Sequence, residues 1–327
     1  MFFCLKLEKF LSEWNNGGAF VEVKTSGSTG TPKQMLVEKE RMLASARMTC
    51  DFLGLHEGDT ALLCMPVDFI AGKMMVVRSI ERGLKLSAVE PSNHPFKGLS
   101  QAFDLVAMVP SQVYETLKAP AEAGLLAQCK NIIIGGGAIS AELQRMIEAK
   151  DFEGCVWSSY GMTETLSHIA LRRLNGPEAS EWYTPFEGVE VSLNEDGCLV
   201  INAPYVCKDI LVTNDIAEIH EGRFRIKGRK DNVICSGGIK IQIEEVEELL
   251  RPHLTEPFAI TGKSDEKFGE AVVLLTESSD VSGIEQTCKK VLPRYWNPKH
   301  IVRVASIQMT ETGKPARKQI SLLAKNI

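Results

Sequence analysis

The sequence predicts an α/β fold with a large N-terminal lobe and a small α+β C-terminal lobe. Between residues 59 and 158, apolar runs of strand length alternate with helical patterns, which is typical of a mainly parallel sheet covered on both faces. From residue 186 the pattern changes to antiparallel hairpins with Asp-Gly and Glu-Gly turns. A polar, turn-rich stretch at 228–232 then marks the predicted boundary between domains 1–228 and 229–327.

Composition places the chain among ordinary soluble proteins. Of its 327 residues 44% are hydrophobic and 24% are charged, which excludes fibrous and disordered classes. A formal net charge of -5 disfavours a nucleic-acid partner, so local donors would have to hold a phosphate ligand. The nine cysteines show no CxxC spacing and indicate reduced thiols. No run approaches a membrane helix of ~20 residues and no signal peptide is evident, so we expect a cytoplasmic protein without a membrane partner.

The first elements surround a loop that is typical of phosphate binding. An amphipathic helix is predicted within residues 1–19, followed by strand-like runs at 20–24 and 34–37. Between these runs lies TSGSTGTPK at 25–33, where glycines allow N–H groups to converge on one anion and hydroxyl and lysine side chains add donors. A Walker A loop would open a helix. The flanking strands therefore argue against a P-loop NTPase, and a plain surface hairpin is the alternative.

The alternating region contributes the remaining elements of the large lobe. Helices are predicted at 40–52, 72–82, 111–117 and 141–150, and strands at 59–66, 84–89, 103–109, 131–134 and 154–158. Gly83 is expected to terminate the second of these helices. In parallel sheets ligands bind beyond the carboxyl ends of the strands, so the residues that follow each strand are candidates for a site.

Two strands end in unusual sequences. The strand at 131–134 runs into Gly135-Gly136-Gly137-Ala138, where missing side chains leave room for a flat ring or simply allow a sharp turn, and Ser140 can cap the next helix. The strand at 154–158 runs into SYGMTET at 159–165, a predicted strand-to-helix junction. Tyr160 could stack on a base, Thr163 could bond a phosphate and Glu164 could hold Mg²⁺. A capped helix start is the alternative.

The last third of the chain mixes hairpins with a small α+β segment. Strands are predicted at 189–193, 198–202, 211–215, 215–219 and 223–227, and Asp215 ends one of them with a carboxylate that can accept both hydrogen bonds of a ribose diol. Beyond the boundary, strands are predicted at 239–243, 258–261, 270–275 and 300–304, and helices at 244–250, at 284–292 and at the chain's end. A glycine-lysine loop at 310–318 precedes the last helix.

Four separated stretches occur together in one order. They are TSGSTGTPK, YGMTET at 160–165, TND at 213–215 followed by GRKDNVI from 228, and TGKPARK at 312–318. This order resembles the adenylate-forming superfamily of acyl-CoA synthetases, luciferases and peptide-synthetase adenylation domains, over about residues 20 to 320. The resemblance implies two domains with ATP between them, Mg²⁺, a small carboxylic acid and coenzyme A as co-substrate. It leaves the oligomeric state open, with a homodimer as one option.

The resemblance assigns roles to the matching residues. The phosphates of ATP would be contacted by Thr25, Ser26, Ser28, Thr29 and Lys33. Adenine would be lined by Gly136, Gly137 and Ala138, with Tyr160 stacked near it and Gly161 beside it. Thr163 would bond the α-phosphate, and Glu164 would serve as the metal ligand.

The same resemblance covers the second half of the chain. Asp215 and Arg229 would bind the ribose, although Asn214 stands where glycine is usual. Asp231 would be the hinge between the domains, and Lys314 would be the catalytic lysine that supplies positive charge as a carboxylate attacks the α-phosphate. Gly237 and Gly238 would border the access tunnel of the thiol. The lysine loop would leave before the thiol attacks, with Asp231 absorbing the rotation.

Two departures from the family concern the acid. Only 24 residues precede the phosphate loop, where family members carry a much longer segment, and the stretch 65–72 lacks the usual histidine. Contact with the acid is therefore expected on Asp68, Phe69 or Lys73. The run MPVDFIAGKMMVVRSI most resembles o-succinylbenzoate-CoA ligases of menaquinone synthesis. A dianionic acid needs a second positive partner, for which Lys73 and Arg78 are candidates, with solvated surface charges as the alternative.

Other functions stay open at this point. One is another acyl- or aryl-CoA ligase, and a second is an adenylation enzyme that loads an amino or aryl acid onto a carrier-protein thiol, where an aspartate such as Asp68 would bind the amino group. A third is an adenylate binder without catalysis. The presence of Thr163, Glu164 and Lys314 argues against the third.

Overall fold

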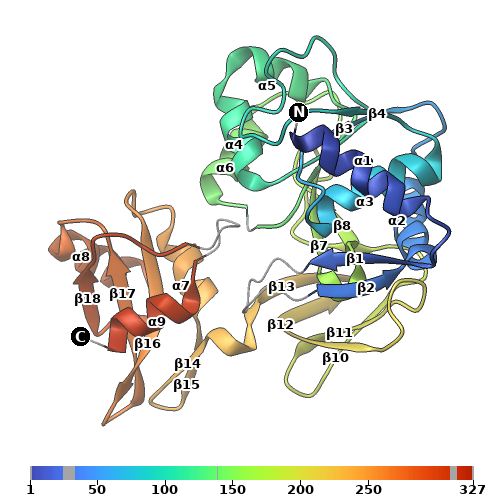
Figure 1. Cartoon of the computed structure of the whole chain (residues 1–327). Helices are drawn as coiled ribbons and strands as arrows, with labels where there is room; N and C mark the ends of the chain where they lie inside the picture. The colour runs from blue at the N-terminus through green and yellow to red at the C-terminus, as the bar shows by residue number, and fades with distance from the viewer. Residues whose placement is uncertain (1, 25–33, 138, 310–314, 326–327) are drawn as a thin grey trace. The chain divides into compact units, whose positions relative to one another are not determined.

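The computed structural model of the protein describes residues 2–24, 34–137, 139–309 and 315–325 (Figure 1). The chain divides into two compact units. The first consists of Met1–Val191, Ile201–Leu211 and His220–Phe224, and the second of Ser192–Val200, Val212–Ile219 and Arg225–Ile327. The chain thus passes between the units several times over residues 191–225 before it continues in the second unit.

A seven-stranded sheet forms the centre of the first unit, in the order β4-β3-β5-β6-β7-β8-β9. Its strands are β3 (Thr60–Leu63), β4 (Lys85–Ala88), β5 (Leu105–Met108), β6 (Asn131–Ile134), β7 (Cys155–Gly161), β8 (His168–Arg173) and β9 (Thr184–Pro185). Strands β4, β3, β5, β6 and β7 run parallel, whereas β8 and β9 add antiparallel pairs. The predicted mainly parallel sheet is confirmed, and β8 and β9 are strands that the sequence pattern did not reveal.

Helices cover both faces of this sheet. They are α2 (Lys39–Leu53), α3 (Ile70–Arg82), α4 (Pro110–Lys118), α5 (Pro120–Ala127) and α6 (Ala141–Ala149). Leu62, Val106 and Ile132 pack into one core with α4, α5 and α6. Their sequence neighbours point to the opposite face, as strand geometry requires, and are also fully buried. Gly83 ends α3 in the left-handed conformation, and Ser140 Oγ accepts the Leu143 N–H at 3.1 Å, so both predicted caps are confirmed.

A hairpin precedes this sheet. Helix α1 (Phe2–Trp14) is followed by β1 (Phe20–Lys24) and β2 (Gln34–Glu38), which pair antiparallel. The phosphate-loop sequence at 25–33 connects them and lies outside the described residues. Because a strand begins directly after that sequence, at Gln34, the structure agrees with the exclusion of a Walker A helix.

A separate four-stranded sheet has the order β10-β11-β12-β13. Its strands are β10 (Glu190–Leu193), β11 (Cys198–Asn202), β12 (Leu211–His220) and β13 (Arg223–Arg229). The predicted turns at Asp196-Gly197 and Glu221-Gly222 separate the strands of its two hairpins. The prediction that a strand ends at Asp215 was wrong, because β12 continues unbroken through this residue to the Glu221-Gly222 turn.

The rest of the second unit is an α+β structure, as predicted. Strands β14 (Val233–Ser236), β15 (Ile239–Gln242), β16 (Phe258–Asp265), β17 (Gly269–Thr276) and β18 (His300–Arg303) form its sheet, with the order β15-β14-β17-β16 and β18 beside β17. Its helices are α7 (Ile243–Leu250), α8 (Val281–Val291) and α9 (Arg317–Lys325). Helices α7 and α8 cover one face of the sheet, and α9 packs on the other through Ile320 and Ala324. Only β14 was not predicted.

Two expectations concern the chain as a whole. All nine cysteines are free thiols, which confirms the prediction made from their spacing. Within the described ranges, every helix is too short or too polar to cross a bilayer.

Candidate functional site

The glycine run after β6 is the first predicted site at the carboxyl edge of the parallel sheet. Gly136 has a φ of +78°, a conformation that favours glycine. A Cβ atom on Gly135 would lie 2.5 Å from Ser159 Oγ on β7. Close packing between adjacent strand ends therefore accounts for part of this run. Gly137 is half-buried, and Ala138 lies outside the described residues.

The segment after β7 differs from the predicted strand-to-helix junction. Strand β7 continues through Gly161, and after a single 3₁₀ turn at Thr163–Thr165 the chain returns as β8. A Cβ on Gly161 would lie 2.3 Å from the Ser167 carbonyl oxygen, so the return crosses directly over this glycine. Since β8 pairs back onto β7 at once, no length of chain is left for a helix. That part of the prediction was wrong.

Tyr160 is fixed at the end of β7 by other aromatic rings. Its ring meets Phe224 edge-on at 5.0 Å between centroids and lies tilted to Tyr183 at 5.8 Å. Tyr183 is tied in turn to β7, since its hydroxyl lies 2.9 Å from Ser158 Oγ. These contacts hold the half-buried Tyr160 ring in one orientation, as a stacking surface for a base requires.

The 3₁₀ turn presents the two polar residues of YGMTET. The Met162 N–H donates to Thr165 Oγ1 at 3.0 Å and so fixes the turn, with Thr163 half-buried and Glu164 exposed. No cluster of three potential metal ligands occurs in the described part of the chain. One accessible carboxylate fits Mg²⁺ all the same, because this ion is commonly held by one or two carboxylates together with substrate phosphates and water.

Arg78 on α3 is a buried cation. It is 2% exposed, and its Nη2 donates to Ser167 Oγ at 2.7 Å. Its Nε has no hydrogen-bond partner, and across the described residues no carboxylate forms an ion pair with it. Burial lowers its pKa to about 10. The guanidinium therefore retains unused capacity to bind an anion.

His168 on β8 extends the polar group around Arg78. Its Nε2 lies 3.1 Å from Thr49 Oγ1, and its Nδ1 lies 3.3 Å from Ser167 Oγ. Burial, and to a lesser degree the nearby charge of Arg78, hold the His168 pKa well below its usual value, so the imidazole is neutral at pH 7. Sequence reasoning missed Thr49, Ser167 and His168, because no motif marks them. Thr49 comes from α2, and Ser167 and His168 lie just before and at the start of β8, so only the packing of distant parts of the chain brings them to α3.

Lys73 and Phe69 differ in their surroundings. Lys73 is 8% exposed, donates to the Glu22 carbonyl oxygen, and lies 5.2 Å from the centroid of the Phe10 ring. The alternative that Lys73 and Arg78 are solvated surface charges was therefore wrong for both. Phe69 is 43% exposed and lines a cavity of about 350 Å³ together with Asp68.

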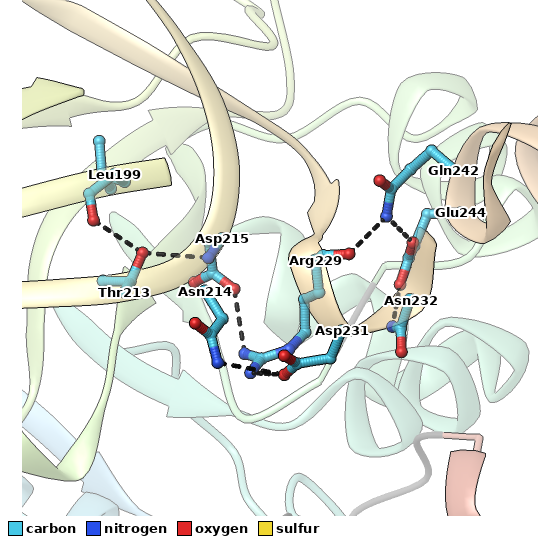
Figure 2. Close-up of polar contacts among 9 residues, drawn as sticks. All are labelled: Leu199, Thr213, Asn214, Asp215, Arg229, Asp231, Asn232, Gln242 and Glu244. Carbon is cyan, nitrogen blue, oxygen red and sulfur yellow. Dashed lines mark hydrogen bonds and ion pairs between the residues drawn. The ribbon is translucent and has the colours of Figure 1, made fainter. Parts of the chain in front are cut away.

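The predicted ribose site and hinge form one polar network in the second unit (Figure 2). Arg229 Nη1 donates to Asp215 Oδ1 at 3.0 Å, and its Nη2 donates to Asp231 Oδ2 at 3.0 Å. Asn214, where the family pattern has glycine, donates from Nδ2 to the same Asp231 oxygen at 3.2 Å. The Asp215 N–H donates to Thr213 Oγ1 at 3.1 Å. Three motif residues that are separated in the sequence are thus brought together.

The glycine pair between β14 and β15 makes a tight turn. Gly237 and Gly238 have φ angles of +58° and +81°, which favour glycine at both positions. The Gly237 N–H donates to the Phe268 carbonyl at 2.8 Å, whereas a Cβ on Gly238 would meet no atom within 4 Å. Some predicted site residues lie outside the described ranges, namely Thr25, Ser26, Ser28, Thr29, Lys33, Ala138 and Lys314.

Residues 24–202 match the family model described as AMP-binding enzyme. The chain belongs to the AMP-binding enzyme family. An acyl-CoA synthetase (AMP-forming)/AMP-acid ligase II-like protein from Dyadobacter fermentans, a family relative of known structure, is 35% identical, with a TM-score of 0.68 over 98% of this chain and 94% of that chain. The family resemblance seen in the sequence is confirmed.

Curated relatives of this AMP-binding enzyme carry a more specific name. The 2-succinylbenzoate--CoA ligases of Salmonella typhimurium and Enterococcus faecalis are 26% and 25% identical over 84% and 90% of this chain. The chain spans 62% and 67% of their lengths. O-succinylbenzoate coenzyme A synthetase (MenE) from Bacillus subtilis, solved with ATP and magnesium ion, has a TM-score of 0.73 at 22% identity, covering 91% of this chain and 69% of that one. At that identity the likeness shows the fold alone.

Proposed function

We propose that this member of the AMP-binding enzyme family is an ATP-dependent acid-CoA ligase that acts through an acyl-adenylate, with o-succinylbenzoate as its acid. The single observation that carries the acid is the shared name of relatives from Salmonella, Enterococcus and Listeria, each about 25% identical over most of this chain. The reaction would join the acid to the thiol of coenzyme A, with AMP and pyrophosphate as the other products.

The buried cation on α3 supports a dianionic acid. One carboxylate of o-succinylbenzoate reacts with ATP, and the other needs a positive partner. Arg78 has an unpaired Nε and no carboxylate partner among the described residues, so an incoming carboxylate would complete its coordination. Lys73 is less suited, because a backbone carbonyl and the Phe10 ring already surround its ammonium group. Phe69, which lines a cavity, would contact apolar parts of the acid.

Adenylation is assigned to residues of both units. Attack of the acid on the α-phosphate concentrates negative charge on the phosphate oxygens, so catalysis depends on positioning and on fixed positive charge. The donors of the 25–33 loop would hold the β- and γ-phosphates, Thr163 would bond the α-phosphate, and Lys314 would approach the reacting oxygens. Glu164 would hold Mg²⁺, which when bound neutralises phosphate charge. Glycines 136 and 137 and the fixed ring of Tyr160 would bind adenine.

The network around Arg229 is assigned to the ribose and to the change between half-reactions. Asp215 would accept from the ribose hydroxyls, with its carboxylate oriented by Arg229 at 3.0 Å. Residues 229–327 would form a mobile domain that swivels at Asp231. This motion would withdraw Lys314 after adenylation and bring Gly237 and Gly238 to the acyl-adenylate, where they border the path of the thiol.

One assay separates the candidate functions. The protein is incubated with ATP, Mg²⁺, coenzyme A and a panel of acids that includes o-succinylbenzoate, benzoate and amino acids, and both AMP and thioester are measured. AMP with thioester for o-succinylbenzoate is the expected result. AMP without any CoA thioester would instead indicate an adenylation enzyme that loads a carrier protein. An amino acid is a less suitable substrate for such an enzyme here, because Asp68, the candidate partner of an amino group, already forms an ion pair with Lys6 at 2.8 Å. No AMP with any acid would refute the proposed reaction.

A further inference from the structure

The side chain of Gln242, at the end of β15, packs against the end of β13 at Gly228 and Arg229. Its Nε2 donates to the Arg229 carbonyl oxygen at 2.9 Å, as Figure 2 shows, and also contacts Glu244 Oε2. A Cβ on Gly228 would lie 2.3 Å from Gln242 Nε2 and 2.7 Å from its Cγ, so the amide side chain occupies the space above this glycine. Gln242 is only 8% exposed. The contact is therefore a closely packed, partly buried hydrogen bond.

This hydrogen bond spans the proposed hinge. Arg229 precedes residue 231 in the chain and Gln242 follows it, so the bond joins the two segments that a swivel at 231 would separate. A second contact spans the hinge in the same way, because Lys227 Nζ on β13 lies 3.7 Å from Glu245 Oε1 on α7. Any rotation at 231 that carries β15 and α7 away from β13 must break both contacts.

The side chain of Asp231 restricts how the hinge can turn. Its Oδ2 accepts from Arg229 on β13 and from Asn214 on β12, so it is tied to the strands that precede the hinge. A rotation about φ of Asp231 would move its Cβ relative to those strands and break both bonds. A rotation about ψ would leave them in place. A ψ rotation is therefore opposed by the two contacts that span residue 231, Gln242 to Arg229 and Lys227 to Glu245. The first of these is the more buried.

We infer that Gln242 is a latch residue that holds this chain in one of two arrangements of residues 232–327 relative to β13. The inference rests on the proposed two-step reaction and on a swivel at Asp231. Gln242 touches neither substrate nor reacting atoms in this scheme and acts as a positioning residue. Loss of one partly buried neutral hydrogen bond corresponds to a change of about threefold to tenfold in the ratio of the two arrangements.

The arrangement can be measured without any substrate. Fluorophores are introduced through unnatural amino acids at the exposed positions Asp151 and Gln286, which avoids the nine native cysteines. Single-molecule energy transfer then reports the ratio of arrangements. Gln242→Ala should shift this ratio by about threefold to tenfold. Gln242→Glu keeps the size of the side chain but places a carboxylate against a carbonyl oxygen, and it should shift the ratio in the same direction.

The matched control is Gln308→Ala, since this glutamine is exposed and, among the described residues, its side chain donates only to nearby Ser306 Oγ at 3.2 Å. It should leave the ratio unchanged. Wild-type ratios in both Gln242 variants would overturn the latch. If the alanine variant does not fold, the test rests on the Gln242→Glu variant alone. If the wild-type protein forms no AMP with any acid, the proposed function is refuted. The energy-transfer measurement still tests the latch in that case, because it uses no substrate.

A second readout connects the latch to the reaction. Acyl-adenylate formation is followed by ATP–pyrophosphate exchange, and thioester formation is followed from preformed adenylate. Gln242→Ala should change the ratio of these two rates by about the factor seen in energy transfer, because each arrangement serves one half-reaction. Equal changes in both half-reactions would contradict a latch and indicate a general loss of structure.

Discussion

Replacing Arg78 with methionine should make the protein more stable while removing its preference for a dicarboxylic acid. The guanidinium is buried without a carboxylate partner among the described residues, and this burial lowers its pKa from the ordinary value of an arginine to about 10. At 1.36 kcal/mol per pKa unit, this shift corresponds to a cost of about 3 kcal/mol for keeping the charge in the folded protein. The cost is fully present below pH 10 and disappears as the pH rises from about 10 to the ordinary pKa of an arginine in the unfolded chain.

Part of this cost is offset by the hydrogen bond to Ser167, which is worth about 1.5–3 kcal/mol because the donor is charged. Ser167 keeps a second partner in the variant, since its Oγ also lies 3.3 Å from His168 Nδ1. Methionine has a similar length and no charge to desolvate. We therefore expect the free energy of unfolding of Arg78→Met to rise by about 1 kcal/mol.

The assay combines urea unfolding with AMP formation from two acids, o-succinylbenzoate and an analogue that lacks the distal carboxylate. Arg78→Met should raise KM for o-succinylbenzoate by about 100-fold, which corresponds to the loss of about 3 kcal/mol of charged hydrogen bonding, and should leave the analogue nearly unaffected. Arg82→Met on the same helix is the control, because Arg82 is paired with Asp51 and should not affect either acid. Lower stability together with equal losses for both acids would show that Arg78 is only structural.

Three further predictions concern other residues. Lys314→Ala should nearly abolish adenylation but spare thioester formation from preformed adenylate, and equal loss in both half-reactions would refute domain alternation. Arg317→Met should lower the free energy of unfolding, measured by urea titration, by about 3–5 kcal/mol. Arg317 donates twice at 2.7 Å to the buried Glu247 carboxylate, which the substitution would leave unpaired. A loss below about 1 kcal/mol would contradict this expectation. The folded-state pKa of His168 lies below 6.5, so stability should fall by up to about 1.4 kcal/mol per pH unit below pH 6.5, and His168→Gln should remove this slope.

Local patterns predicted most elements of the fold correctly. Between residues 60 and 149 every strand and every helix except α5 follows from neighbouring residues, as do the αL cap at Gly83 and the serine cap at Ser140, and the structure confirms them. Hairpin turns at Asp196-Gly197 and Glu221-Gly222 were predicted for the same reason. Each of these features depends on backbone preferences and hydrophobic periodicity within a few residues. Such local features can be predicted from the sequence without knowledge of the tertiary structure.

The errors occurred where pairing partners lie elsewhere in the chain. A strand-to-helix junction was expected after Tyr160, but β8 pairs back onto β7 over Gly161. The strand expected to end at Asp215 continues, because the turn that ends β12 lies further along at Glu221-Gly222. Propensity near these residues permits either outcome, and the sheet partner decides between them.

The sequence by itself determined the family, through its ordered motifs, and the alternation of strands and helices, through local periodicity. Only the tertiary structure decided that Arg78 and Lys73 are buried and which groups surround each of them, because strands and helices from distant parts of the chain supply the neighbours. The hydrogen bond between Gln242 and Arg229 has the same origin. Motifs record which side chains are available, whereas packing determines which of them retain an unused charge or hydrogen-bond donor.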